Sequence, residues 1–226
     1  MNRDYRHLKI GILAGFILIF TYLILSFDIF NRNSIFTLIT QDIYSMGMEI
    51  IFIGVVTILL IFFVPISWLS AISAVLFGLR GAIFISIGGI LSAIISFSIA
   101  RIFKDDVSRI IDRIYYRKKR KLTLDEIYLK IKKYGFGYVL FLRSLPFIPF
   151  SMGNYIFGIS FIPFKQFVFA TLLAVSIGQG INVYFFDKAL RIGENPIDTL
   201  IAGVIKGIYF LVIFLWSRKS KYNAKD

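Results

Sequence analysis

The sequence predicts an all-α integral membrane protein: an inverted repeat of two re-entrant helical hairpins, each followed by a transmembrane helix, with a further transmembrane helix at each end. Three observations predict this fold. The 226-residue chain is 58% hydrophobic, with a mean hydropathy of +0.78, well outside the soluble range. Prolines interrupt its apolar runs, and two interrupted stretches resemble each other. Basic residues gather in some connecting segments only, which sets the topology.

The first transmembrane helix is predicted over residues 10–27, after the basic start MNRDYRHLK. This run is about as long as a spanning helix, and no A-x-A-like cleavage site follows it, so we expect a retained helix rather than a signal peptide. The link over residues 28–49 carries one basic and three acidic residues. By the positive-inside rule, the N-terminus is cytoplasmic and this link is external.

Charge and parity place the first half of the repeat. Residues 102–135 form a basic cytoplasmic segment, because the run from Arg101 to Lys133 holds twelve basic and five acidic residues. An odd number of crossings therefore separates the external link from Arg101. A first re-entrant hairpin over residues 48–81, followed by one transmembrane helix over residues 82–101, satisfies that count.

The most informative stretch is the second re-entrant hairpin, predicted over residues 136–161. It contains Pro146 and Pro149, and each proline removes a backbone donor and disfavours helical geometry in the residue before it. A helix break inside hydrocarbon is tolerated only where the freed backbone groups are buried in protein or line a wet cavity. The same stretch carries Arg143, and an intramembrane guanidinium usually faces a bundle interior or a substrate path. The alternative is that Arg143 snorkels to a headgroup from a helix end.

The remaining elements complete the second half. A transmembrane helix over residues 163–186 leads to the segment DKALRIGENPID, which has more acids than bases and is predicted to be external. A last helix over residues 199–216 returns the chain to a basic cytoplasmic tail. Both termini are therefore predicted to be cytoplasmic.

The two halves also resemble each other in sequence. LFG ending at Gly78 parallels IFG ending at Gly158, with Pro65 and Pro146 placed similarly before them. Because the first half starts outside and the second inside, the repeats are inverted, a recurrent transporter design with its substrate site near the midplane. After each FG, a stripe of small or polar residues at every fourth position lies on one helix face, where backbones approach closely. The stripes are Gly88, Ser92, Ser96 and Ala100 in the first half, and Ala170, Ala174, Gly178 and Asn182 in the second.

The sequence argues against a conventional enzyme. It has no cysteine and a single histidine, His7 in the basic N-terminus, and it contains no phosphate-binding loop motif. We therefore expect no catalytic residues, no metal ligands and no cofactor. Nucleic acid is not an expected partner, because the basic residues lie between membrane segments. The cluster RKKRK from Arg117 is either an anionic-lipid contact or a topology signal on a solvated face. The helical spacing of Leu124 to Gly135 fits a helix along the inner membrane surface.

Several polar residues have two interpretations each. Asn154 would cap the helix after the break or coordinate a headgroup. Gln179 and Asn182 lie on or near the small-residue stripe, where interhelical hydrogen bonding is the more common role. Glu49 is either a plain loop charge or a coupling acid at the outer interface. Lys206 interrupts the last helix, and a snorkelling stem is the commoner explanation.

The order of residues in the second hairpin resembles the signature of the DedA-like superfamily, also called SNARE-associated Golgi or VTT-domain proteins. The pattern is R-x2-P-x2-P-x4-N-x3-G with aromatic residues in between, and an upstream stretch resembles the family's first half, P…FG-x2-G-x6-G…R. Together the two stretches span roughly residues 65–182. The matching residues are Arg143, Pro146, Pro149, Asn154 and Gly158 in the second motif, and Pro65, Gly78, Gly81, Gly88 and Arg101 in the first.

The resemblance implies a protein that moves phospholipids or polyprenyl-phosphate carriers between leaflets, as a scramblase or flippase, with membrane lipids bearing anionic or phosphate headgroups as partners. Many relatives carry an acid soon after the first-hairpin proline, but here Pro65 is followed by ISWLS. Ala74 and Ser92 replace commonly found glycines. These departures place the chain closer to the VTT branch and weigh against proton coupling.

Alternatives to lipid transport stay open at this point. One is a proton- or cation-coupled small-solute transporter using Glu49 or another acid. Another is a non-transporting membrane organiser in envelope homeostasis that binds through its basic cytoplasmic segment. The short basic tails and the bias toward Ile and Lys favour a bacterial plasma membrane. The oligomeric state is open, with a homo-oligomer among the alternatives.

Overall fold

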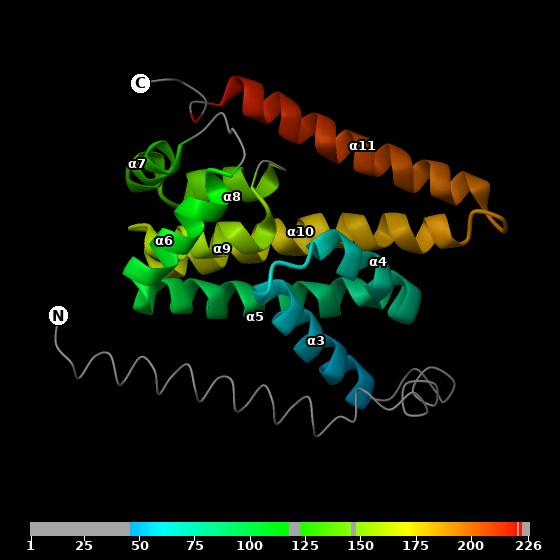
Figure 1. Ribbon diagram of the computed structural model, residues 1–226. Helices are drawn as coiled ribbons and strands as arrows, with labels where there is room; N and C mark the ends of the chain where they lie inside the picture. The colour runs from blue at the N-terminus through cyan, green and yellow to red at the C-terminus, as the bar shows by residue number, and fades with distance from the viewer. Residues whose placement is uncertain (1–45, 118–122, 146–147, 221, 223–226) are drawn as a thin grey trace. The chain divides into compact units, whose positions relative to one another are not determined.

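The computed structural model describes residues 46–117, 123–145, 148–220 and 222. The predicted first helix over residues 10–27, most of the RKKRK cluster and Pro146 lie outside these residues. The chain divides into two units, Met1–Glu49 and Ile50–Asp226, and the second carries the features discussed below. Every regular element in the described part is helical (Figure 1).

Three helical stretches are long and apolar enough to span a membrane within the described residues: Ile66–Ile102, Phe164–Leu190 and Pro196–Lys219. The first of these combines three successive elements. In chain order the elements are α3 (Met46–Ile61), α4 (Ile66–Phe77), the 3₁₀-helix η1 (Gly78–Arg80), α5 (Gly81–Ile102), α6 (Lys104–Tyr115), α7 (Leu124–Tyr134), α8 (Phe136–Ser144), α9 (Phe150–Ile159), α10 (Phe164–Leu190) and α11 (Pro196–Lys219).

The first helix break separates α3 from α4 at Phe62–Pro65. Phe63 has a φ of +68°, a left-handed conformation that costs a non-glycine residue about 1–2 kcal/mol. Contacts with α9 hold this conformation in place: the Phe63 ring stacks on Tyr155 with centroids 5.4 Å apart, and the Tyr155 hydroxyl donates to the Ile61 carbonyl at 3.1 Å. The break thus has a hydrogen-bond partner for a carbonyl that the ended helix leaves free.

The stretch Ile66–Ile102 is not one straight helix. At η1 the chain turns, and α4 packs along the beginning of α5 (Figure 1). Gly78 provides the turn with a φ of +55°, which a side chain would strain. The Ser73 hydroxyl of α4 donates to the Gly81 carbonyl at 2.8 Å and closes the turn.

The second helix break lies between α8 and α9. Gly135, with a φ of +53°, separates α7 from α8, and Leu145 leaves the helical region with a ψ of 141°. Pro149 then precedes the first residue of α9 in an extended conformation, where a missing N–H costs no helical hydrogen bond. The described chain therefore contains two helical pairs, α3–α4 and α8–α9, each interrupted beside a proline.

The second arm of each interrupted pair packs on the long helix of the other half. Helix α9 packs on α5, α4 packs on α10, and α5 and α10 pack on each other. The α5–α9 contact is close, because a Cβ at Gly158 would come within 2.5 Å of the Phe97 carbonyl oxygen. These contacts among α4, α5, α9 and α10 form the centre of the unit.

The α6 and α7 helices bury their apolar faces against protein. Val107 and Ile111 of α6, and Ile127 and Ile131 of α7, join the cluster formed by α8 and α9. The apolar face expected to lie on the membrane surface is therefore covered by the protein itself. Thr123 begins α7 with a capping box to Glu126.

The last helix, α11, packs mainly on α10 and is fastened near both ends. At its start, Lys188 forms an ion pair with Asp198 at 3.1 Å. Beyond its end, the Tyr222 ring packs against Tyr134, Tyr138 and Phe141, and the Tyr222 carbonyl accepts a hydrogen bond from Lys130 at 2.7 Å. Most of the α11 side chains between these points are exposed.

Candidate functional site

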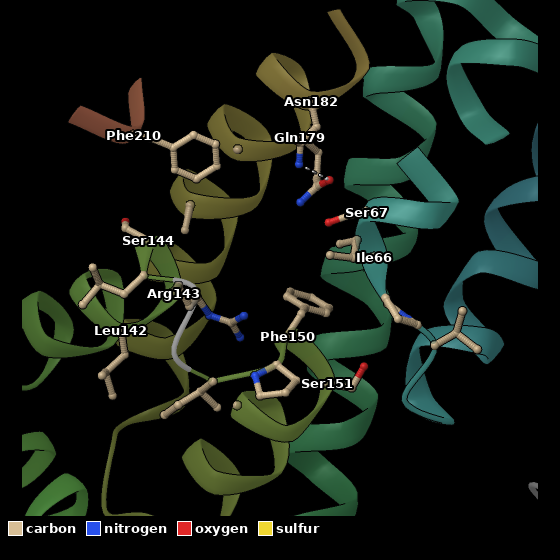
Figure 2. A pocket seen from close by; sticks show the side chains of 18 of the residues that line it. Ile66, Ser67, Leu142, Arg143, Ser144, Phe150, Ser151, Gln179, Asn182 and Phe210 are labelled. Atoms are coloured by element: carbon tan, nitrogen blue, oxygen red, sulfur yellow. Dashed lines mark hydrogen bonds between the residues drawn. The ribbon is translucent and has the colours of Figure 1, made fainter. Parts of the chain in front are cut away.

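Both helix breaks open on one cavity of about 420 Å³. Its wall comes from both interrupted helical pairs, from α10 and from α11. Figure 2 shows Arg143 extending from α8 toward Phe150, with Ser67 of α4 and Gln179 and Asn182 of α10 on another side of the cavity. Pro65 and Pro149, the prolines that follow the two breaks, also line it.

Arg143 is the central cation of this cavity. It comes from the last turn of α8, where the chain is about to leave the helix. Its guanidinium lies over three phenylalanine rings, at 5.2 Å from Phe150, 5.2 Å from Phe157 and 5.1 Å from Phe167. Cation–π contacts of this kind stabilise a desolvated guanidinium by about 2 kcal/mol. They do not neutralise its charge.

The partner of Arg143 is the amide of Asn154. Nη2 of Arg143 donates to Oδ1 of Asn154 at 2.7 Å, which joins α8 to α9 across the break. Asn154 is fully buried at the fifth residue of α9 and does not cap that helix, so the predicted capping role is wrong. Nε of Arg143 and Nδ2 of Asn154 are both buried without a hydrogen-bond partner. Buried donors left unpaired cost about 1–3 kcal/mol each.

No carboxylate lines this cavity among the described residues. The guanidinium therefore has aromatic faces and an amide around it, but no anion. A buried charge without a counter-ion destabilises the folded protein unless a group of opposite charge binds to it. The arrangement is suited to receive an anionic group, to which a guanidinium donates short charge-assisted hydrogen bonds.

The α10 wall carries amides and small residues. Gln179 accepts a hydrogen bond from the Ser70 hydroxyl of α4 at 2.5 Å, which confirms the predicted interhelical bonding for this residue. Asn182 donates to the same Gln179 oxygen at 3.4 Å. Ala174 and Gly178 of the predicted small-residue stripe line the cavity, so their small size leaves room beside Arg143. The corresponding stripe of α5, from Gly88 to Ala100, is instead buried in helix packing.

The remaining predicted site residues that the structure describes do not line the cavity. Gly78 and Gly81 form the α4–α5 turn, and a Cβ at Gly88 would come within 2.7 Å of the Val56 side chain of α3. Gly158 makes the close contact with α5 described above. Glu49 lies in the first turn of α3 and belongs to the other unit.

Arg101 has a structural role beyond the topology signal expected from its position. Its Nε donates to the Gly158 carbonyl and its Nη2 to the Ile162 carbonyl, both at 2.9 Å. Gly158 lies in the last turn of α9, where carbonyls have no intrahelical partner, and Ile162 lies in the link between α9 and α10. Arg101 therefore fastens the end of α5 to the α9–α10 junction.

Sequence reasoning did not assign the α11 side of the cavity. Lys206, Tyr209 and Phe210 line it, although Lys206 was interpreted as a snorkelling residue. The available signal was the spacing on α11: Ala202, Lys206, Tyr209 and Ile213 share one helix face, and Ala202 and Ile213 are buried. In the described part of the chain, no cluster of His, Cys, Asp or Glu is placed to hold a metal ion.

Comparison with protein families finds a match to the VTT domain over residues 64–188, more than half of the 226-residue chain. The matched region runs from the first helix break to the end of α10 and contains both proline breaks and Arg143. Comparisons with curated proteins and with solved structures found no match.

Proposed function

Because the chain belongs to the VTT-domain family, the DedA and SNARE-associated membrane proteins, we propose that its cavity carries lipid headgroups between the two leaflets of the bilayer. The chain is a membrane protein, and proteins of this family are generally not enzymes. The observation that carries the proposal is the Arg143 guanidinium, which lines the cavity and has no carboxylate partner among the described lining residues. A phosphate headgroup would complete this charge while the acyl tails stay in lipid.

The proposed membrane arrangement makes α3–α4 and α8–α9 re-entrant hairpins that enter from opposite sides. The reciprocal packing of α9 on α5 and of α4 on α10 supports an inverted repeat. In this arrangement the two breaks, marked by Pro65 and Pro149, meet near the bilayer midplane. A headgroup that crosses there would contact the polar cavity wall instead of water. It would do so at the depth where a charge in hydrocarbon has its highest free-energy cost.

The composition of the wall favours an anionic headgroup over a transported cation. Proton- or cation-coupled transport needs acidic side chains along the transport path. The polar side chains of the described lining carry only guanidinium, ammonium, amide and hydroxyl groups. The bacterial plasma membrane, with both termini cytoplasmic, is part of the same proposal. Phospholipids and polyprenyl phosphates both carry the required phosphate.

The test is lipid exchange in liposomes that contain the purified chain and a trace of fluorescent phospholipid. Protein-dependent exposure of inner-leaflet label to an impermeant quencher is expected. Arg143→Ala should lower the rate by at least about tenfold, since a charge-assisted hydrogen bond contributes about 1.5–3 kcal/mol. Arg109→Ala, which removes an exposed arginine of α6, is the matched control and should leave the rate unchanged.

The proposal fails if folded wild-type protein moves neither phospholipid nor a polyprenyl phosphate probe above the level of empty liposomes. Equal rates for Arg143→Ala and wild type would remove Arg143 from the transport path. Folding of each variant is checked by its thermal unfolding in detergent.

A further inference from the structure

Lys206 stands in the middle of α11, ten positions after the first residue of the helix, Pro196, and thirteen before the last, Lys219. At about 1.5 Å per residue, the nearer helix end is about 15 Å away, beyond the reach of a lysine side chain. Lys206 also lies on the inward-facing stripe with Ala202 and Ile213, whereas neighbours such as Ile205 and Ile208 face outward with 41% and 55% exposure. Snorkelling therefore does not account for its position.

The ammonium of Lys206 is held at the cavity by aromatic rings. Nζ lies 4.2 Å from the ring centre of Phe185 and 5.0 Å from that of Phe186, both on α10. Lys206 and Arg143 thus reach one cavity from two different helices, α11 and α8. Each is supported by phenylalanine faces, and neither meets a carboxylate among the described lining residues.

Two cations without an acid discriminate between headgroups by charge. A zwitterionic headgroup brings an ammonium of its own, which needs an anionic partner or a free aromatic face. The described lining offers no carboxylate for that ammonium, and three of its rings, Phe150, Phe157 and Phe186, already support Arg143 or Lys206. The rings of Phe63, Tyr209 and Phe210 are the aromatic faces that remain in the described lining. A second positive charge would be repelled, whereas a headgroup with net negative charge contacts both cations.

We propose that Lys206 is a second headgroup contact, and that with Arg143 it makes the cavity select phosphate headgroups of net negative charge over zwitterionic ones. This inference rests on the proposed function and concerns the same cavity. The chemistry it names, a phosphate with uncompensated charge, also exists in free phosphate. The apolar wall of Leu142, Ile148 and Phe210 favours a phosphate that is attached to a lipid.

The experiment compares headgroups in the same liposomes. Trace fluorescent phosphatidylglycerol or phosphatidylcholine is placed in one constant bulk lipid, so that the surface potential does not differ between assays. Full-length wild type, Lys206→Gln, Lys206→Arg and Lys219→Gln are reconstituted separately. Lys219 lies on the same helix, exposed and outside the cavity lining, and serves as the matched control.

Wild type is expected to move phosphatidylglycerol about tenfold faster than phosphatidylcholine, because a charge-assisted contact contributes at least about 1.4 kcal/mol. Lys206→Gln should bring this ratio close to one, mainly by slowing phosphatidylglycerol. Lys206→Arg and Lys219→Gln should keep it. A ratio that Lys206→Gln leaves unchanged would overturn the inference, as would a wild-type ratio near one.

Direct lipid binding separates this inference from the proposed function. Native mass spectrometry of the detergent-solubilised chain counts bound phosphatidylglycerol and phosphatidylcholine, and only the former should decrease in Lys206→Gln. Selective, Lys206-dependent binding without exchange would support the inference and refute the transport function. Exchange that depends on Arg143 but not on Lys206 would support the transport function and refute the inference. Displacement of bound phosphatidylglycerol by millimolar inorganic phosphate would contradict the claim that the cavity prefers a phosphate attached to a lipid.

Discussion

Arg143 and Asn154 show how a single pair of residues serves both the fold and the cavity. Their 2.7 Å hydrogen bond joins α8 to α9, while Nε of the guanidinium is buried without a hydrogen-bond partner. The sequence identified both residues, but not their contact. Eleven positions and two prolines separate them, and only the geometry of the break determines that they meet. The break itself was predictable, because proline chemistry is local.

The coupling between these two residues is measurable as a double-mutant cycle. Asn154→Leu should destabilise the protein, because it leaves the guanidinium buried without its amide. Arg143→Met removes a buried charge but leaves Oδ1 of Asn154 without its donor, so its net effect should be smaller than that of Asn154→Leu. In the Arg143→Met background, Asn154→Leu should cost less by about 1.5–3 kcal/mol.

Thermal unfolding in detergent, followed by the fluorescence of Trp68 and Trp216, provides the measurement. Strictly additive effects of the two substitutions would mean that the hydrogen bond contributes nothing to stability. Lipid exchange by Asn154→Leu should fall as well, because Arg143 loses the contact that orients it.

At the scale of helices, the proline positions predict the helix starts better than any other feature of this sequence. Pro65, Pro149 and Pro163 each precede a helix, and Pro196 begins one. Proline is favoured at these positions because the first helical N–H groups have no intrahelical partner. Helix partners were less predictable. The apolar face of α7 is equally suited to a membrane surface and to the α8–α9 core, and only the folded structure distinguishes them.

Glycine substitutions test the close contact between α5 and α9. Gly158→Ala places a Cβ within 2.5 Å of the Phe97 carbonyl and 2.6 Å of the Ala100 side chain, and neither can move without shifting α5. Overpacking of this kind costs about 1–3 kcal/mol. The unfolding temperature of Gly158→Ala should therefore fall.

Gly180 on α10 is the matched control, because nothing lies within 4 Å of a Cβ added there. Gly180→Ala should be neutral or stabilising by about 0.5–1 kcal/mol, as expected for alanine replacing glycine inside a helix. If both variants unfold at the wild-type temperature, the close α5–α9 contact does not exist in the folded protein.

At the scale of the whole molecule, charge and parity predict which segments share a side of the membrane, and this topology stays a prediction. The meeting of both breaks at one cavity did not follow from the sequence. It depends on the packing of α4 on α10 and of α9 on α5, which are contacts across the two halves.

The absence of cysteine makes the predicted topology straightforward to test. Single cysteines at two exposed positions, Glu194→Cys and Lys132→Cys, are introduced into the chain. In intact cells, an impermeant maleimide should label Glu194→Cys, and Lys132→Cys should become reactive only after permeabilisation. Labelling of both from the same side would contradict an odd number of crossings between α7 and the α10–α11 connection. The cysteine-free parent reports background labelling.

The reciprocal packing of the two halves also constrains the order of biosynthesis. The surface of α10 that receives α4 is made only after roughly 90 further residues have been added, which takes on the order of 5–20 s at about 5–20 residues per second. During that interval the Ser70 hydroxyl lacks its Gln179 partner and the Ile61 carbonyl lacks Tyr155. The contacts that complete the first half therefore form only after the second half has been synthesised.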